Sequence, residues 1–135
     1  MGTWGTGVFD NDGAWDVLAE FRQAAPERRE AVLRQALAEA ADCTDYLENP
    51  EAQGAVAAAA VVAAVCSGRP AVSINDPGVL AAVTSISPGP ELVALSRRAL
   101  ERVTGDASEW RELWAEADDL IEPLAAVAEI RAGLS

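Results

Sequence analysis

Carboxylates spaced three or four residues apart are the side chains of this sequence that could do chemistry. Such spacing places two acids on one helix face, and the pairs are Asp12 with Asp16, Asp42 with Asp45, and Asp118 with Glu122. Paired acids can bind Mg²⁺, Mn²⁺ or Ca²⁺ through their oxygens, or separate their pKa values for acid and base catalysis. A carboxylate–metal site would centre on Asp10, Asp12 and Asp16.

The best-defined metal motif, the calcium-binding EF-hand loop, is excluded here. If Asp12 and Gly13 take the fifth and sixth loop positions, Val8 stands at the first and Ala19 at the twelfth, where oxygen ligands are required. Helix capping explains the acids more simply, because their oxygens accept from free N–H groups at a helix start. We therefore expect Asp12 to be an N-cap, with Asp10 and Asn11 as alternatives, and we expect no metal or cofactor.

Most other catalytic machinery is excluded. The chain has no histidine, so Ser-His-Asp sites, Cys-His sites and histidine-ligated metals cannot be built. No serine lies in a Gly-x-Ser-x-Gly context, and no glycine-rich loop is followed by Lys-Ser or Lys-Thr. We favour a non-enzymatic binding or regulatory protein, for example an immunity-type inhibitor. An enzyme that depends on a carboxylate-bound metal is the alternative.

The first twelve residues are the most unusual stretch. Their glycines alternate with Trp4 and Phe9, a mixture too rich in glycine for a regular helix and too aromatic for an unstructured tail. We expect an ordered loop over 1–12 that packs on the helices. The candidate binding surface consists of aromatic and polar residues from both ends of the chain: Trp4, Phe9, Asp10, Asn11, Asp12, Trp15, Asp16, Trp110 and Trp114.

The large aromatic residues have two interpretations. Trp110 and Trp114 stand four residues apart in an apolar stripe, which is typical of a helix core. We expect a large share of the core to come from six aromatic residues, namely Trp4, Phe9, Trp15, Phe21, Trp110 and Trp114. The alternative is that the tryptophans form a partly exposed surface for recognising a peptide or protein.

One set of N-terminal residues has a specific spacing: Trp4, Gly5, Gly7, Phe9, Asn11, Asp12, Ala14 and Asp16. This spacing resembles the opening signature of the bacterial DUF4259 family, a domain of unknown function. Weaker similarity continues through residues 46–51, 57–64 and 110–114, so the resemblance covers most of the chain. It implies an acid inside the alanine run, where this chain has Ala60, and it implies no activity.

Charge restricts the partners. There are 22 acids and 10 bases, and the net charge of −12 repels nucleic-acid phosphates and anionic lipids. We expect no binding to nucleic acid or membrane. A protein partner, with a basic surface as one option, fits this charge, although solubility alone also explains acids that are spread along the chain.

The cysteines indicate a compartment. Cys43 and Cys66 form no metal-binding motif, and we expect buried thiols on two helices, about 15–20 Å apart and too far to bridge. Two unbridged thiols favour a reducing cytoplasm.

Hydrophobic periodicity predicts one all-α domain over 1–135 with five or six helices. The expected helices span 13–25, 27–47, 50–67 and 90–104, with a short one at 77–83 and a long C-terminal segment. The helix at 50–67 is apolar nearly all round and should be central. In the C-terminal segment, Asp106 should cap the start, the stripe from Trp110 to Ala128 should be buried, and Pro123 should kink or split the helix near 118–122.

Overall fold

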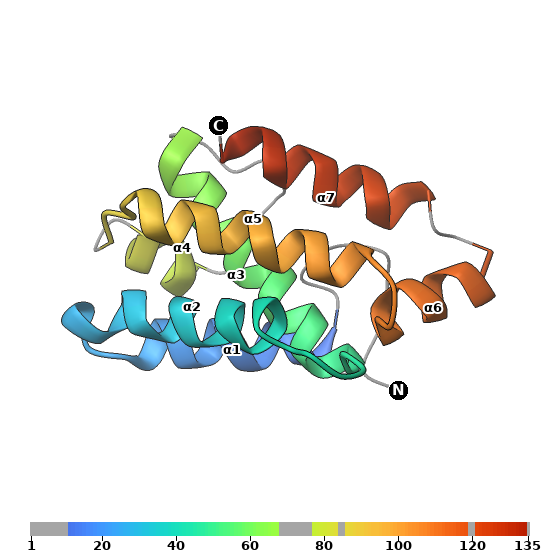
Figure 1. Ribbon diagram of the computed structural model, residues 1–135. Helices are drawn as coiled ribbons and strands as arrows, with labels where there is room; N and C mark the ends of the chain where they lie inside the picture. The colour runs from blue at the N-terminus through green and yellow to red at the C-terminus, as the bar shows by residue number, and fades with distance from the viewer. Residues whose placement is uncertain (1–10, 68–76, 84–85, 119–120, 135) are drawn as a thin grey trace.

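The computed structural model describes residues 11–67, 77–83, 86–118 and 121–134 (Figure 1). The described residues form seven α-helices and no strand. This confirms the all-α prediction, whereas the expected number of five or six helices is too low. The helices are α1 (Asp12–Gln23), α2 (Pro26–Ala41), α3 (Asn49–Ser67), α4 (Pro77–Val83), α5 (Pro90–Thr104), α6 (Glu109–Glu116) and α7 (Ile121–Gly133). The expected loop over 1–12 lies outside the described residues except for its last two positions.

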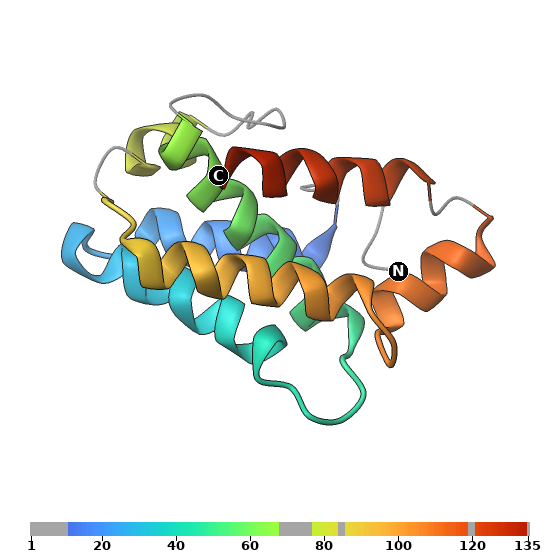
Figure 2. The same ribbon diagram turned by 45° about the horizontal axis from the view of Figure 1, so that its top comes forward.

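Helix α3 is the centre of the fold, as its composition predicts. It packs against α1, α2, α5 and α7, and every residue from 52 to 64 is buried. Figure 2 shows α5 between α2 and α7. Within the described residues, α3 is the one helix long and apolar enough to cross a membrane, and 72% of its most apolar window lies buried in this fold. Such burial is typical of a core helix.

Small residues let helices approach α3 closely. A Cβ atom on Gly54 would lie 2.8 Å from Cγ2 of Val17 in α1, and one on Gly133 of α7 would lie 3.1 Å from Cβ of Ala63. Most of the buried residues of α3 are alanines, so helix axes can lie near one another without large side chains between them. The fold is therefore tightly packed despite its few aromatic residues.

Helix α2 ends at Ala41, so the prediction that it continues to residue 47 is wrong. Residues beyond Ala41 leave the helix because the backbone of Leu47 pairs with the strand-like segment around Ser108 instead. The predicted bounds of α4 and α5 are confirmed, and those of α1 and α3 hold to within two residues. Ala25, the predicted end of the first helix, is exposed and lies two residues beyond the end of α1.

The C-terminal helix is split, as Pro123 predicts. Helix α6 ends at Glu116, Asp118 has a φ of 56°, and α7 begins at Ile121, so Pro123 lies in a first turn where its missing N–H costs no helical bond. The predicted buried stripe is wrong on both sides of the break: Leu113 of α6 is 43% exposed, and Ala117 is exposed. Ile121 is 86% exposed and Ala128 is also exposed, because the break rotates α7 onto another face.

The aromatic residues contribute less to the core than expected. Phe21 and Trp110 are buried, Trp114 is half-buried, and Trp15 is 50% exposed, so the expectation for Trp15 is wrong. Trp4 and Phe9 lie outside the described residues. Leucine, valine and alanine side chains of α2, α3 and α5 fill most of the described core instead.

Both cysteines are unbridged, as predicted, but neither is buried. Cys43 is half-buried because α2 ends before it, and Cys66 is exposed in the last turn of α3.

Candidate binding surface

Helix α1 begins with a side-chain cap from Asn11. The Oδ1 atom of Asn11 accepts a hydrogen bond from the N–H of Ala14 at 2.7 Å, and Asn11 is 6% exposed. The predicted cap, Asp12, is instead the first helical residue and is exposed. Its carboxylate suits the positive end of the helix dipole. Asn11 therefore provides the capping hydrogen bond and Asp12 provides the favourable charge, whereas Asp12 was expected to do both.

Gly13 fixes the start of α1 against the start of α3. Its N–H donates to Oε1 of Gln53 at 3.2 Å, and both residues are buried. A Cβ atom on Gly13 would lie 2.6 Å from the carbonyl oxygen of Pro50, so only glycine allows this approach. The sequence signal for Gln53 is its position as a lone polar side chain in an otherwise apolar run.

One face of α1 carries exposed acids and an exposed tryptophan. Asp12, Asp16 and Glu20 are four residues apart and all exposed, and Trp15 lies on the same face at 50% exposure. The opposite face of α1 is buried against α3. We call the set Asp12, Trp15, Asp16 and Glu20 the α1 outer face. An aromatic ring beside carboxylates can bind a guanidinium or ammonium group.

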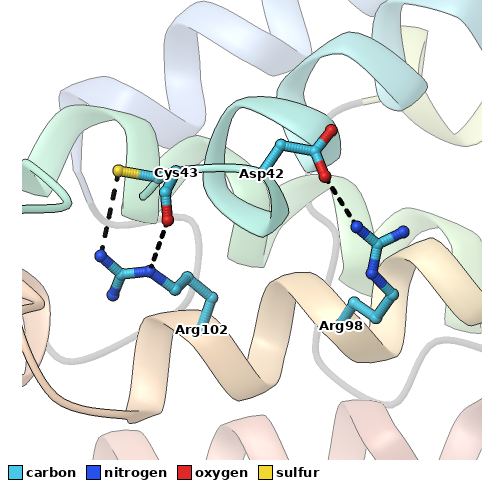
Figure 3. Close-up of polar contacts among 4 residues, drawn as sticks. All are labelled: Asp42, Cys43, Arg98 and Arg102. Carbon is cyan, nitrogen blue, oxygen red and sulfur yellow. Dashed lines mark hydrogen bonds and ion pairs between the residues drawn. The ribbon is translucent and has the colours of Figure 1, made fainter. Parts of the chain in front are cut away.

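A second polar cluster joins the loop after α2 to the loop after α5. Arg102 of α5 donates from Nε to the carbonyl of Cys43 at 3.1 Å and from a terminal nitrogen to the carbonyl of Asp106 at 2.9 Å. The same guanidinium donates to the carbonyls of Asp45 and Ala107. In Figure 3, Arg102 reaches the carbonyl and sulfur of Cys43. Four backbone acceptors occupy this guanidinium, so it holds the two loops together.

A neighbouring ion pair is more exposed. Arg98, one turn earlier in α5, pairs with Asp42 at 2.7 Å (Figure 3), and both side chains are more than half exposed. Surface pairs of this kind contribute little to stability.

Backbone hydrogen bonds also join the segment before α3 to the start of α6. The N–H of Leu47 donates to the carbonyl of Ala107 at 2.8 Å, and the N–H of Glu109 donates to the carbonyl of Leu47 at 2.9 Å. Oε1 of Glu109 accepts from the N–H of Asn49 at 2.7 Å, at the start of α3. Ser108 caps α6, so the predicted capping box from Asp106 is wrong: Glu109 caps α3 instead of its own helix.

Tyr46 has the one resolved pKa shift among the described residues. Its hydroxyl donates to Oε1 of Glu112 at 3.0 Å. Partial desolvation, this hydrogen bond and the negative charges of Glu112, Glu109 and Glu116 raise the pKa of Tyr46 to about 12. Tyr46 is therefore a neutral donor at physiological pH.

The structure does not unite all of the residues that the sequence suggested for binding. Asp12, Trp15 and Asp16 share the α1 outer face, whereas Trp110 is buried and Trp114 is half-buried in α6, which packs on α3 and α5. Trp4, Phe9 and Asp10 lie outside the described residues. Sequence reasoning missed Gln53 and Arg102, which position the ends of helices.

The metal alternative depends on three acids that are only partly described. Asp12 and Asp16 are both exposed on α1, and Asp10 lies outside the described residues. Where the structure describes the chain, no three Cys, Asp or Glu side chains are grouped so that they could hold a metal ion.

Comparison with known proteins identifies a family. The family model described as "Domain of unknown function (DUF4259)" matches residues 2–126. No curated protein and no solved structure matches the chain. Ala60, where the resemblance implied an acid, is 1% exposed in the core. Four signature residues are described: Asn11 and Ala14 are buried at the start of α1, which gives them a structural role, whereas Asp12 and Asp16 are exposed.

Proposed function

We propose a binding function for this chain, which belongs to the DUF4259 family: it is a non-enzymatic, cytoplasmic regulatory module that binds a basic segment of a partner protein on the α1 outer face. The single observation behind the proposal is Trp15. This side chain is 50% exposed on a helix whose other face is fully packed, and two exposed carboxylates, Asp12 and Asp16, flank it. Tryptophan is enriched among the residues that dominate protein interfaces.

The chemistry of this face favours a cationic partner. A guanidinium stacked on an indole ring contributes about 0.5–2 kcal/mol, and each nearby exposed carboxylate adds about 0.2–1 kcal/mol. The net charge of −12 also attracts a basic protein over a distance and speeds its association at low salt. The same charge repels phosphate backbones, so the proposed partner is a protein and not a nucleic acid. An inhibitor of a basic enzyme, of the immunity type, is one function of this class.

A labelled helical peptide with arginine at every fourth position tests the proposal. Fluorescence anisotropy with the full chain should show binding that weakens with salt. Trp15→Ala and Asp16→Lys should each weaken binding about tenfold, which corresponds to about 1.4 kcal/mol. Glu39→Lys makes the same charge change at an exposed site on α2 and is the matched control.

The control decides between a site and a general charge effect. Glu39→Lys should change the affinity less than about twofold, because it lies outside the α1 outer face. If Glu39→Lys weakens binding as much as Asp16→Lys, or if Trp15→Ala leaves binding unchanged, net charge alone attracts the peptide and the proposal is wrong.

A further inference from the structure

Helix α7 has two apolar faces, of which the fold uses one. The inner face packs on α3 and α5 and consists of Pro123, Val127 and Ile130, all buried, and the buried Leu134 follows directly after the helix. The outer face consists of Ile121, Ala125, Ala128 and Ala132, all exposed. The outer residues follow one another at intervals of four, three and four, which places them on one line along the helix, opposite the buried face. We call these four residues the α7 outer face.

This arrangement differs from that of α5, which is also a long helix with one face in water. The exposed residues of α5 include Glu91, Arg97, Arg98 and Glu101, as expected for a face in water. On α7 the corresponding line is wholly apolar, and Ile121 is 86% exposed. Apolar residues at alternating intervals of three and four form the seam along which two helices pack. The three alanines would allow the second helix to approach closely.

Charged residues beside the seam specify the second helix. Glu122 and Glu129 are seven residues apart on one flank of the α7 outer face, and both are exposed. Neither carboxylate has a hydrogen bond or ion pair among the described residues, whereas Arg131 on the other flank pairs with Glu101 at 3.6 Å. The free charge along the seam is therefore negative, and its complement is a row of lysine or arginine.

A second copy of this chain does not fit that requirement. If two α7 helices packed antiparallel about a two-fold axis, Glu122 of each copy would lie near Glu129 of the other. Like charges at such positions are destabilising, and each copy also carries a net charge of −12. The occupant is therefore a different chain.

We infer that the α7 outer face binds one amphipathic helix of a partner protein, with leucine or isoleucine along its seam and lysine or arginine facing Glu122 and Glu129. This surface is separate from the α1 outer face, since α3 packs between α1 and α7 (Figure 1). The chain would then hold two basic segments at once, on opposite sides of α3.

A designed amphipathic peptide with a leucine seam and lysine on both flanks tests the inference. Its binding to the full chain, measured by fluorescence anisotropy, should weaken about tenfold in the double variant Glu122→Lys/Glu129→Lys. The same peptide with glutamate in place of lysine should bind that double variant and not the wild type. This reciprocal rescue requires the two carboxylates to face the bound helix.

Controls separate the alternatives. Ala125→Glu should abolish binding, whereas Ala94→Glu, at an exposed alanine of α5, should leave it unchanged. Trp15→Ala should also leave it unchanged, so this inference and the proposed function can fail separately. Absence of rescue, or equal losses in Ala125→Glu and Ala94→Glu, would overturn the inference. So would a dimer in sedimentation analysis that Ala125→Glu dissociates, because the occupant would then be a second copy.

Discussion

Replacing Gly13 with alanine tests whether close approach of α1 to α3 sets the position of the α1 outer face. The added Cβ would lie 2.6 Å from the carbonyl oxygen of Pro50 and 2.7 Å from Cβ of Gln53. Overpacking of this kind costs about 1–3 kcal/mol. Displacing Oε1 of Gln53 from the buried N–H of Gly13 costs about 1–3 kcal/mol more. The better helix propensity of alanine offsets about 0.5–1 kcal/mol of this cost. The free energy of unfolding should therefore fall by about 3 kcal/mol.

Urea denaturation followed by circular dichroism measures this loss. Gly13→Ala should lower the midpoint without changing the slope, because the same surface is exposed on unfolding. Gly89→Ala is the matched control. A Cβ at Gly89 would meet no atom within 4 Å. Alanine is a weaker N-cap than glycine, which destabilises the fold, but it also stiffens the unfolded chain, which stabilises the fold. The free energy of unfolding should therefore change by less than about 0.5 kcal/mol. A Gly13→Ala variant as stable as Gly89→Ala would refute the argument from close approach.

Three further predictions concern the junctions that hold the helix ends. Asn11→Ala should lower the free energy of unfolding by about 1–2 kcal/mol in the same assay, since it removes the cap of α1; no loss would mean that the cap is redundant. Arg102→Ala should cost about 2–3 kcal/mol because it frees four carbonyl acceptors, whereas Arg98→Ala should cost less than about 0.5 kcal/mol; equal losses would contradict the assigned roles. Tyr46, the only tyrosine, should titrate near pH 12 by tyrosinate absorbance, and Glu112→Gln should move the midpoint toward 10; a wild-type midpoint at 10 would argue against the hydrogen bond. Because the folded pKa is raised, the stability that Tyr46 contributes is present below pH 10 and is lost as the pH rises through 12.

Local signals in the sequence were sufficient for much of the helical framework. The alanine run predicts a buried central helix because it offers no polar face to water, and α3 has that position. Pro90 and Gly105 bound α5, since proline favours a first turn and glycine follows a last one. Pro123 likewise predicts the break between α6 and α7. Each of these signals acts within one or two helical turns, so they can be recognised without knowing which other helices pack against the segment.

The predictions that were wrong depend on contacts between residues far apart in the sequence. Residues 42–47 have a helix-compatible pattern, but the carbonyls of Cys43 and Asp45 satisfy Arg102, which lies almost sixty positions away in the sequence. The choice between two apolar faces of α7 depends on how α7 is oriented relative to α6 after the break, and periodicity does not encode that orientation.

The candidate surface was only partly predictable for the same reason. Asp12, Trp15 and Asp16 follow helical spacing, so the sequence places them on one face once α1 is recognised. Whether that face is exposed depends on α3, and the sequence alone assigned Trp15 to the core. Trp110 has the same residue type and is buried at 6% exposure.

The pairing of Leu47 with the segment around Ser108 ties the start of α3 to the start of α6. A fragment that stopped after α5 would lack the carbonyl of Ala107, which accepts from the N–H of Leu47, and the carboxylate of Glu109, which accepts from the N–H of Asn49. The first turn of the central helix would then begin with amides open to solvent. In native-state hydrogen exchange, these two amides should exchange only through global unfolding, together with the interior of α3.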